Sequence, residues 1–279
     1  MRLESDILIL PPLSFDTVNM FYQILSTIKV NTSTDLWSEW QWFRYNTKQA
    51  DLVVELQYNM YTIFGVEVLD DQPGKPVLKS DDCFLCVNSN WTRAKINSFD
   101  GNILEISKIF NALLFTHLST RHAIEMHASL IDISGKGIMF LGPSGIGKTT
   151  QAELWMKYRN VEIINGDMVF VKQEEDGFLG CGSPWHGSSP YCLNRQVPLA
   201  ALVILKQSPE NSIRRLTGFE MVAEVMNSVF FPTWYKEGHE AACKTLDALL
   251  RTVPVYELSC RPDEEAVRLT EEAVFGGRA

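Results

Sequence analysis

The sequence has no long apolar run and no basic leader, and each absence excludes a class of protein. No window of roughly 18 consecutive residues is apolar, so we expect no membrane-spanning helix. Residues 1–15 contain two acids and a short apolar stretch that is interrupted by Pro11 and Pro12, which does not fit a secretory signal peptide. We therefore expect a cytoplasmic protein that has no membrane partner.

Paired cysteines are scarce as well. The six cysteines include a single C-x-x-C, formed by Cys83 and Cys86, in a stretch that is typical of a strand. A zinc site usually needs a second such pair or nearby histidines. We therefore interpret the cysteines as small apolar packing residues in a reducing compartment.

The chain also lacks a basic block. It has 25 Lys and Arg against 34 Asp and Glu, a net charge of −9, so we expect neither general nucleic-acid binding nor an anionic membrane partner. An anion such as a phosphate must then bind at a local site, against the overall charge. With 46% hydrophobic and 21% charged residues the chain is typical of a globular protein, and its 279 residues allow one or two domains.

Residues 1–110 form the first of two predicted units, a β-rich domain with a connecting helix. The helix extends to about residue 120, and Asp100 is its predicted cap. Four aromatic residues between positions 37 and 43 have no basic stripe beside them, which favours a core or interface over base stacking. The expected strands are 51–57, 61–69, 83–87 and 91–96, of which the last two form a hairpin.

Residues 111–279 form the second unit, in which strands and helices alternate. Thr217 and Glu220 lie in capping-box register before an apolar helix that ends near Pro232, and Pro262 opens a terminal helix. The other expected helices are 148–160 and 238–252. The expected strands are 123–133, 135–142, 161–164, 168–172, 178–182, 200–206 and 254–260. The fold class of the chain is therefore α/β, or α+β.

The glycine-rich segment 142–149 indicates a site for a nucleoside triphosphate. It fits G-x-x-x-x-G-K-[ST], follows an apolar strand and precedes a helix. The glycines let backbone N–H groups surround phosphate oxygens, and the helix N-terminus adds positive potential. Lys148 then contacts the β- and γ-phosphates, and the Thr149 hydroxyl ligates Mg²⁺. The expected nucleotide-binding residues are Gly142, Pro143, Ser144, Gly145, Ile146, Gly147, Lys148, Thr149 and Thr150.

A second metal ligand is expected near the end of a neighbouring strand. Asp167 follows the apolar segment 161–164 and is the best candidate, with a turn former or helix cap as its alternative role. Asp132, inside the strand before the glycine-rich loop, and Asp176, in an ordinary turn, are weaker candidates.

Three segments together resemble the catalytic domain of HPr kinase/phosphorylase. They are His127-Ala-Ser, GIMFLGPSGIGKTT at 137–150 and IINGD at 163–167. The resemblance is specific over residues 122–190 and looser over 190–275. It implies the P-loop architecture that this domain shares with ATP-dependent phosphoenolpyruvate carboxykinase, here in the group with an added N-terminal domain. It also implies binding of ATP with Mg²⁺ and phosphoryl transfer to a hydroxyl.

Carried over residue by residue, the resemblance makes Lys148, Asp167 and His127 the catalytic residues and Thr149 and Asp167 the Mg²⁺ ligands. The family has two adjacent acids, of which the first is the base, but this chain has Gly166 at the first position. In one interpretation a single acid suffices, because phosphoryl transfer through a loose transition state depends mainly on positioning and charge neutralisation. In the other, Asp167 only holds the metal and turnover is weak. The family's later glycine-rich signature has no clear match here, so neither phosphorylase activity nor HPr as the substrate is carried over.

Several other polar groups each have two interpretations. His127 is either a packed core histidine or a contact to the γ-phosphate. The loop 185–189 is either a substrate or lid element or an ordinary crossover. The three arginines of this region either stabilise the transferred phosphate or are solvated. They are Arg195, Arg214 and Arg215.

We therefore expect a Mg²⁺-dependent kinase whose partners are ATP and a hydroxyl-bearing small molecule or peptide. The alternative is a nucleotide-binding regulatory or adaptor protein with little or no transfer activity, which Gly166 favours. A homo-oligomer is an open possibility for either function.

Overall fold

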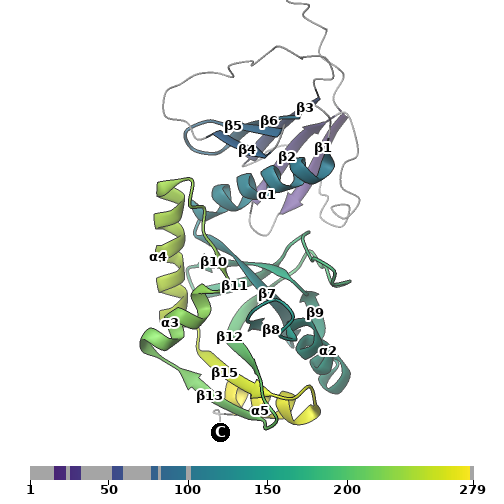
Figure 1. Ribbon diagram of the computed structural model, residues 1–279, viewed down its shortest axis with the longest axis vertical. Helices are drawn as coiled ribbons and strands as arrows, with labels where there is room; N and C mark the ends of the chain where they lie inside the picture. Colours follow the sequence, from purple (N-terminus) through teal and green to yellow (C-terminus); the bar gives the residue numbers. More distant parts are fainter. Residues whose placement is uncertain are drawn as a thin grey trace, which may run out of the picture.

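The computed structural model describes residues 16–22, 26–32, 52–58, 77–80, 83–98 and 102–276. The aromatic cluster at 37–43, the predicted strand 61–69 and Asp100 lie outside these residues. The described residues form two β-sheets and the helices α1 to α5 (Figure 1). Within this part of the chain no helix is long and apolar enough to span a membrane.

The N-terminal sheet has six strands in the order β1-β2-β3-β6-β5-β4. They are β1 (Asp16–Tyr22), β2 (Ser26–Thr32), β3 (Leu52–Tyr58), β4 (Val77–Ser80), β5 (Cys83–Val87) and β6 (Arg93–Ser98). The predicted hairpin is confirmed: β5 and β6 pair antiparallel, and Asn88 Oδ1 accepts from the backbone N–H groups of Thr92 and Arg93. Cys83 lies on the buried face of β5 and Cys86 on the other face, so the pair cannot converge on one metal ion.

The second sheet has nine strands and contains the glycine-rich loop. Its main path is β11-β10-β7-β8-β12-β15-β13, and β9 and β14 both pair with β7. The strands are β7 (Ala123–Ile133), β8 (Lys136–Leu141), β9 (Glu162–Asn165), β10 (Met168–Glu174), β11 (Gly177–Gly182), β12 (Gln196–Gln207), β13 (Ser212–Leu216), β14 (Val229–Phe230) and β15 (Val255–Cys260). The central strand β12 runs parallel to β8 and β15. These elements confirm the α/β class and the strands predicted from residue 123 onward.

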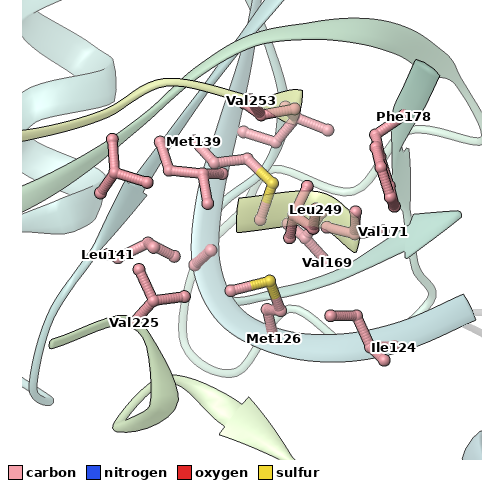
Figure 2. Packing of buried hydrophobic residues seen from close by; sticks show 14 of the residues in the cluster. Ile124, Met126, Met139, Leu141, Val169, Val171, Phe178, Val225, Leu249 and Val253 are labelled. Carbon is pink, nitrogen blue, oxygen red and sulfur yellow. The ribbon is translucent and has the colours of Figure 1, made fainter. Parts of the chain in front are cut away.

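Helices cover both faces of this sheet, and each face has its own apolar core. The helices are α2 (Lys148–Arg159), α3 (Gly218–Met226), α4 (Lys236–Thr252) and α5 (Glu264–Phe275). Residues of α3 and α4 pack with Met126 and Met139 on one face (Figure 2). Residues of α2 and α5 pack with Ile138 and Phe140 on the other face. The strand period of two therefore places successive residues of β8 in different cores.

Two of the predicted helix starts need correction. Thr217 is the N-cap residue of α3, but its side chain makes no capping hydrogen bond. Glu220 pairs with Arg214, so the reciprocal bond of a capping box is missing as well. The helix also ends at Met226, before the predicted end. The α5 helix is capped by Asp263, whose side chain accepts from the N–H of Ala266, so it starts after Pro262.

The connecting helix α1 (Ile103–Ser119) contacts β4, β5 and β6 on one side and β7 and α4 on the other (Figure 1). Its cap is Asn102, whose side chain accepts from Leu104 N, so the prediction of Asp100 was wrong by two positions. The predicted division between residues 110 and 111 falls inside α1. The helix shares one core with β5, with Phe170 of β10 and with Cys181 of β11. The division of the chain into two domains stays a prediction.

The strand β7 places a polar stripe between two apolar regions. Its even-numbered residues from Ile124 to Leu130 point into the core under α3 and α4. On the opposite face, Ala123 joins the core of α1 and Ile131 joins the core of α2. Between them on this face lie Glu125, His127 and Ser129. The strand thus carries polar side chains to the space beside the N-terminus of α2.

Candidate active site

The glycine-rich loop connects β8 to α2 and leaves the helix N-terminus open. Gly147, with φ of 111°, is the N-cap residue of α2, and no side chain caps the helix. A Cβ on Gly147 would meet no atom within 4 Å, so the backbone conformation rather than the space requires glycine. The first turn of α2 holds no acid, whereas the first turns of α1, α3, α4 and α5 each hold one or two. The positive end of the α2 dipole therefore has no anion of its own.

Lys148 and Thr149 are held in place by backbone carbonyl groups. Lys148 is 6% exposed, and its Nζ donates to the carbonyl oxygens of Gly142 at 3.0 Å and Pro143 at 3.2 Å. Burial lowers the pKa of Lys148, and the charge of Asp167 partly offsets this effect. The Thr149 hydroxyl donates to the carbonyl of Gly166 at 3.0 Å. The loop lysine and the loop threonine thus both lie close to the strand end that carries Asp167.

Asp167 and His127 form a pair beside the loop. The His127 Nε2 lies 3.0 Å from Asp167 Oδ1, and about a quarter of the His127 side chain and a third of the Asp167 side chain are exposed. This hydrogen bond is the main cause that lowers the pKa of Asp167, with Lys148 and His186 acting in the same direction electrostatically and partial burial opposing them. Asp167 is therefore an anion at neutral pH. His127 thus lies partly exposed beside Asp167, and its contact to the γ-phosphate stays a prediction.

The loop 183–193 closes over this acid. Asn165 Nδ2 donates to the carbonyls of Ser183 and Trp185, while Asn165 Oδ1 accepts from the backbone N–H of Asp167 and of Met168. A Cβ on Gly187 would lie 2.5 Å from Asp167 Oδ2, so this loop residue packs directly on the carboxylate. Its role as a substrate or lid element stays a prediction. Asn165 is a positioning residue that the sequence interpretation missed, although it lies in the segment that includes Asp167.

A cleft of about 570 Å³ opens from the glycine-rich loop. Its walls include residues from the ends of β12 and β15, and Gln151 of α2 lies at its inner side. Gln151 is 3% exposed, and its side-chain Nε2 is a buried donor for which the described chain offers no acceptor. A buried donor of this kind is costly unless a ligand pairs with it. Among the predicted loop residues, Gly145, Ile146, Gly147 and Thr150 line the cleft.

Three of the remaining sequence candidates have structural partners elsewhere. Asp132 accepts from the backbone N–H of Gly135 and pairs with Arg195, which also pairs with Glu162. Arg214 pairs with Glu220 and Glu257, away from the glycine-rich loop. The sequence left Arg195 and Arg214 between a phosphate contact and a surface role, and these pairs favour the surface role. Asp176 lies in the turn between β10 and β11.

Glu125 is a buried acid on the polar stripe that the sequence interpretation also missed. It is 1% exposed, its Oε1 has no partner within the described residues, and burial raises its pKa to about 8. A raised pKa means that the folded protein binds a proton that the unfolded chain releases above about pH 4.5. Stability contributed by this proton is complete at low pH and is lost as the pH rises through about 8.

We expect Glu125→Gln to flatten the pH dependence of stability. The wild type should lose on the order of 1 kcal/mol of unfolding free energy per pH unit at most on this account, while the neutral amide should lose none of it. Urea unfolding at several values between pH 5 and 8.5 measures the two slopes. Glu175→Gln, at an exposed position in the β10–β11 turn, is the matched control. Equal slopes in wild type and Glu125→Gln would contradict the assignment.

Comparisons with known proteins found a matching family model, several relatives and similar solved structures. A family model described as "SynChlorMet cassette protein ScmC" matches residues 93–263. The HPr kinase/phosphorylase of Brevibacillus brevis is 25% identical over 156 residues, which are 55% of this chain and 47% of the relative. That of Clostridium tetani is 32% identical over 113 residues, which are 40% of this chain and 34% of the relative. The chain thus spans half or less of the length of these relatives. A solved HPr(Ser) kinase/phosphatase from Coxiella burnetii aligns with 55% of this chain and 95% of its own, at 14% identity and a TM-score of 0.33.

Proposed function

The chain belongs to the ScmC family of SynChlorMet cassette proteins and is HPr kinase-like, and we propose that it is an ATP-binding, Mg²⁺-dependent kinase. It transfers the γ-phosphate to a hydroxyl of a small molecule or a peptide. One observation carries the proposal: the uncapped N-terminus of α2, with Lys148 and Thr149, lies beside the Asp167–His127 pair. The cleft opens from the same glycine-rich loop. We place the reaction in the cytoplasm, in line with the reducing compartment that the sequence predicts for its cysteines.

The residues present fit a triphosphate with a bound metal. The open α2 N-terminus and the ammonium group of Lys148 suit phosphate oxygens. The buried Nε2 of Gln151, which lacks an acceptor in the described chain, suits a polar group of the nucleotide in the cleft. The Thr149 hydroxyl and the Asp167 carboxylate are oxygen donors of the type that Mg²⁺ prefers. A metal ion held by these two residues would neutralise the charge that develops during transfer.

In this mechanism the protein positions charge and removes one proton. Lys148 and the first amides of α2 orient the γ-phosphate, and the loop 183–193 excludes water from the reacting groups. A bond forms between the acceptor oxygen and the γ-phosphorus while the bond to the bridging oxygen breaks and ADP leaves. The proton of the acceptor passes to the Asp167–His127 pair, in which His127 orients the carboxylate. Phosphoryl transfer passes through a loose transition state, in which positioning and charge neutralisation supply most of the rate. A single acid of lowered pKa, Asp167, is therefore sufficient as the base.

A second function is favoured by one specific observation. The family that this chain resembles has the first of two adjacent acids at position 166. In this chain a side chain at that position would overlap with Ser189. A protein that has lost the first acid and filled its space would bind nucleotide as a regulatory or adaptor protein, with little or no transfer.

Label transfer from ATP separates the two functions. We expect that incubation of the protein with Mg²⁺, γ-labelled ATP and either a cell extract or candidate peptides transfers label to a hydroxyl-bearing acceptor. The Lys148→Ala variant should transfer none, because it lacks the phosphate contact. Nucleotide-dependent thermal stabilisation without any label transfer would favour the regulatory function over the kinase.

A further inference from the structure

The hydroxyl of Ser189 occupies the space that a side chain of residue 166 would need. A Cβ built on Gly166 would overlap with Ser189 Oγ and would lie 2.5 Å from Ser189 Cβ. Gly166 does not have a positive φ, so its backbone conformation is open to any residue. It is therefore the seryl side chain, and not backbone geometry, that restricts this position to glycine.

This placement brings the hydroxyl into the proposed phosphate and metal site. A Cβ built on Gly166 would also lie 3.7 Å from Thr149 Cγ2. The Thr149 hydroxyl donates to the carbonyl of Gly166. The residue that follows is Asp167, against which Gly187 of the same loop packs. Ser189 is thus next to the proposed metal ligand on one side and the proposed base on the other.

The backbone of Ser189 is fixed, whereas its hydroxyl hydrogen has no acceptor. Its N–H donates to the carbonyl of His186 at 2.9 Å, and its own carbonyl pairs with His186 Nδ1. Its Oγ accepts from Tyr191 N at 3.3 Å, but within the described residues no group accepts the hydroxyl hydrogen. With 8% of its surface exposed, Ser189 is also shielded from water. An oriented, shielded hydroxyl with a free hydrogen is a suitable acceptor for a phosphoryl group.

We propose that Ser189 is itself a phosphate acceptor, so that the protein phosphorylates its own loop. The inference rests on the proposed function, since it requires Mg·ATP in the site. The Ser189 Oγ forms a bond to the γ-phosphorus, the bond from the γ-phosphorus to the bridging oxygen breaks, and ADP leaves. The hydroxyl proton passes to the Asp167–His127 pair. The resulting phosphoserine adds a charge of about −1.5 to −2 beside Asp167, which repels the loop from the acid and opens the site.

The test is the mass of the intact protein after incubation of the full chain with Mg·ATP. We expect a gain of one phosphoryl group, located on Ser189 by fragmentation of the peptide that contains it. Ser189→Ala should lose this gain, while Ser188→Ala, at the exposed neighbouring position, should keep it. Gly166→Ala retains the Ser189 hydroxyl but places a Cβ in its space, so this variant should lose at least nine tenths of the modification.

Thermal stabilisation by Mg·ATP, measured on the same samples, distinguishes the possible failures. Ser189→Ala should still be stabilised by Mg·ATP, which shows that its site is intact. If the wild type is stabilised but gains no phosphoryl group, or gains one at another residue, self-phosphorylation of Ser189 is overturned and the proposed function stands. If the wild type is not stabilised at all, the proposed function and the inference are both overturned.

Discussion

Replacing Lys148 by alanine is expected to remove about half or more of the stabilisation that Mg·ATP gives the protein. At an ATP concentration of about 100 times Kd, binding stabilises the wild type by about 2.7 kcal/mol, or roughly 5 °C in Tm for a chain of this size. Loss of a charge-assisted hydrogen bond of about 1.5–3 kcal/mol weakens binding roughly 10- to 100-fold. At the same ATP concentration the variant should retain about 0.4 to 1.4 kcal/mol. Thermal unfolding with and without Mg·ATP measures the difference.

This experiment can be interpreted because Lys148 contributes little to the fold without nucleotide. Among the described residues its buried ammonium group donates to two carbonyl groups, and burial lowers its pKa, so the free protein gains little from this charge. The alanine variant should therefore unfold at nearly the wild-type temperature in the absence of ATP. Lys157→Ala, on the exposed side of the same helix, is the matched control and should respond to ATP like the wild type. An unchanged response of Lys148→Ala would show that the lysine does not contact phosphate.

The parts of the site that could be predicted from the sequence are those that are encoded locally. The strand β8, the glycine-rich loop and α2 are continuous in the chain, so their spacing specified the phosphate-binding turn. Asp167 could be recognised because it follows an apolar strand, and His127 because it lies on the strand before the loop. The structure brings these two residues together at 3.0 Å. Their catalytic roles remain predictions, which the rates of Asp167→Asn and His127→Gln test.

The parts that could not be predicted depend on contacts between distant segments. The sequence shows Gly166 as a missing acid, but only the fold shows that Ser189 fills the same space. In the sequence, Gln151 is an ordinary helix residue. Only the fold places it beside the cleft at the ends of β12 and β15, with a side-chain donor that lacks an acceptor among the described residues. Asp132 lies on the same strand as His127, yet its partner Arg195 lies in a later loop and gives it a structural role. Neither periodicity nor motif spacing contains such information.

Neutralising Asp167 is expected to have the largest effect on turnover. Asparagine keeps the size of the side chain but can neither take the proton of the acceptor nor neutralise a metal ion, so Asp167→Asn should lower the rate of phosphoryl transfer roughly 10²- to 10⁴-fold. The rate of label transfer from ATP, or of ADP release, measures this loss. Asp176→Asn changes an acid of the exposed β10–β11 turn and should leave the rate unchanged. If Asp167→Asn transfers phosphate as fast as the wild type, then Asp167 is neither the base nor a required metal ligand.

The pH dependence of the rate tests how His127 acts on this acid. The hydrogen bond from His127 lowers the pKa of Asp167, so the ionised carboxylate is present above this lowered value and is lost as the pH falls through it. In His127→Gln the pKa of Asp167 should return toward its ordinary value of about 4, and the acid limb of the pH–rate profile should move to higher pH. A histidine with a merely structural role would change the rate at every pH without moving this limb. A moved limb together with a reduced rate would identify Asp167 and His127 as one proton-accepting unit.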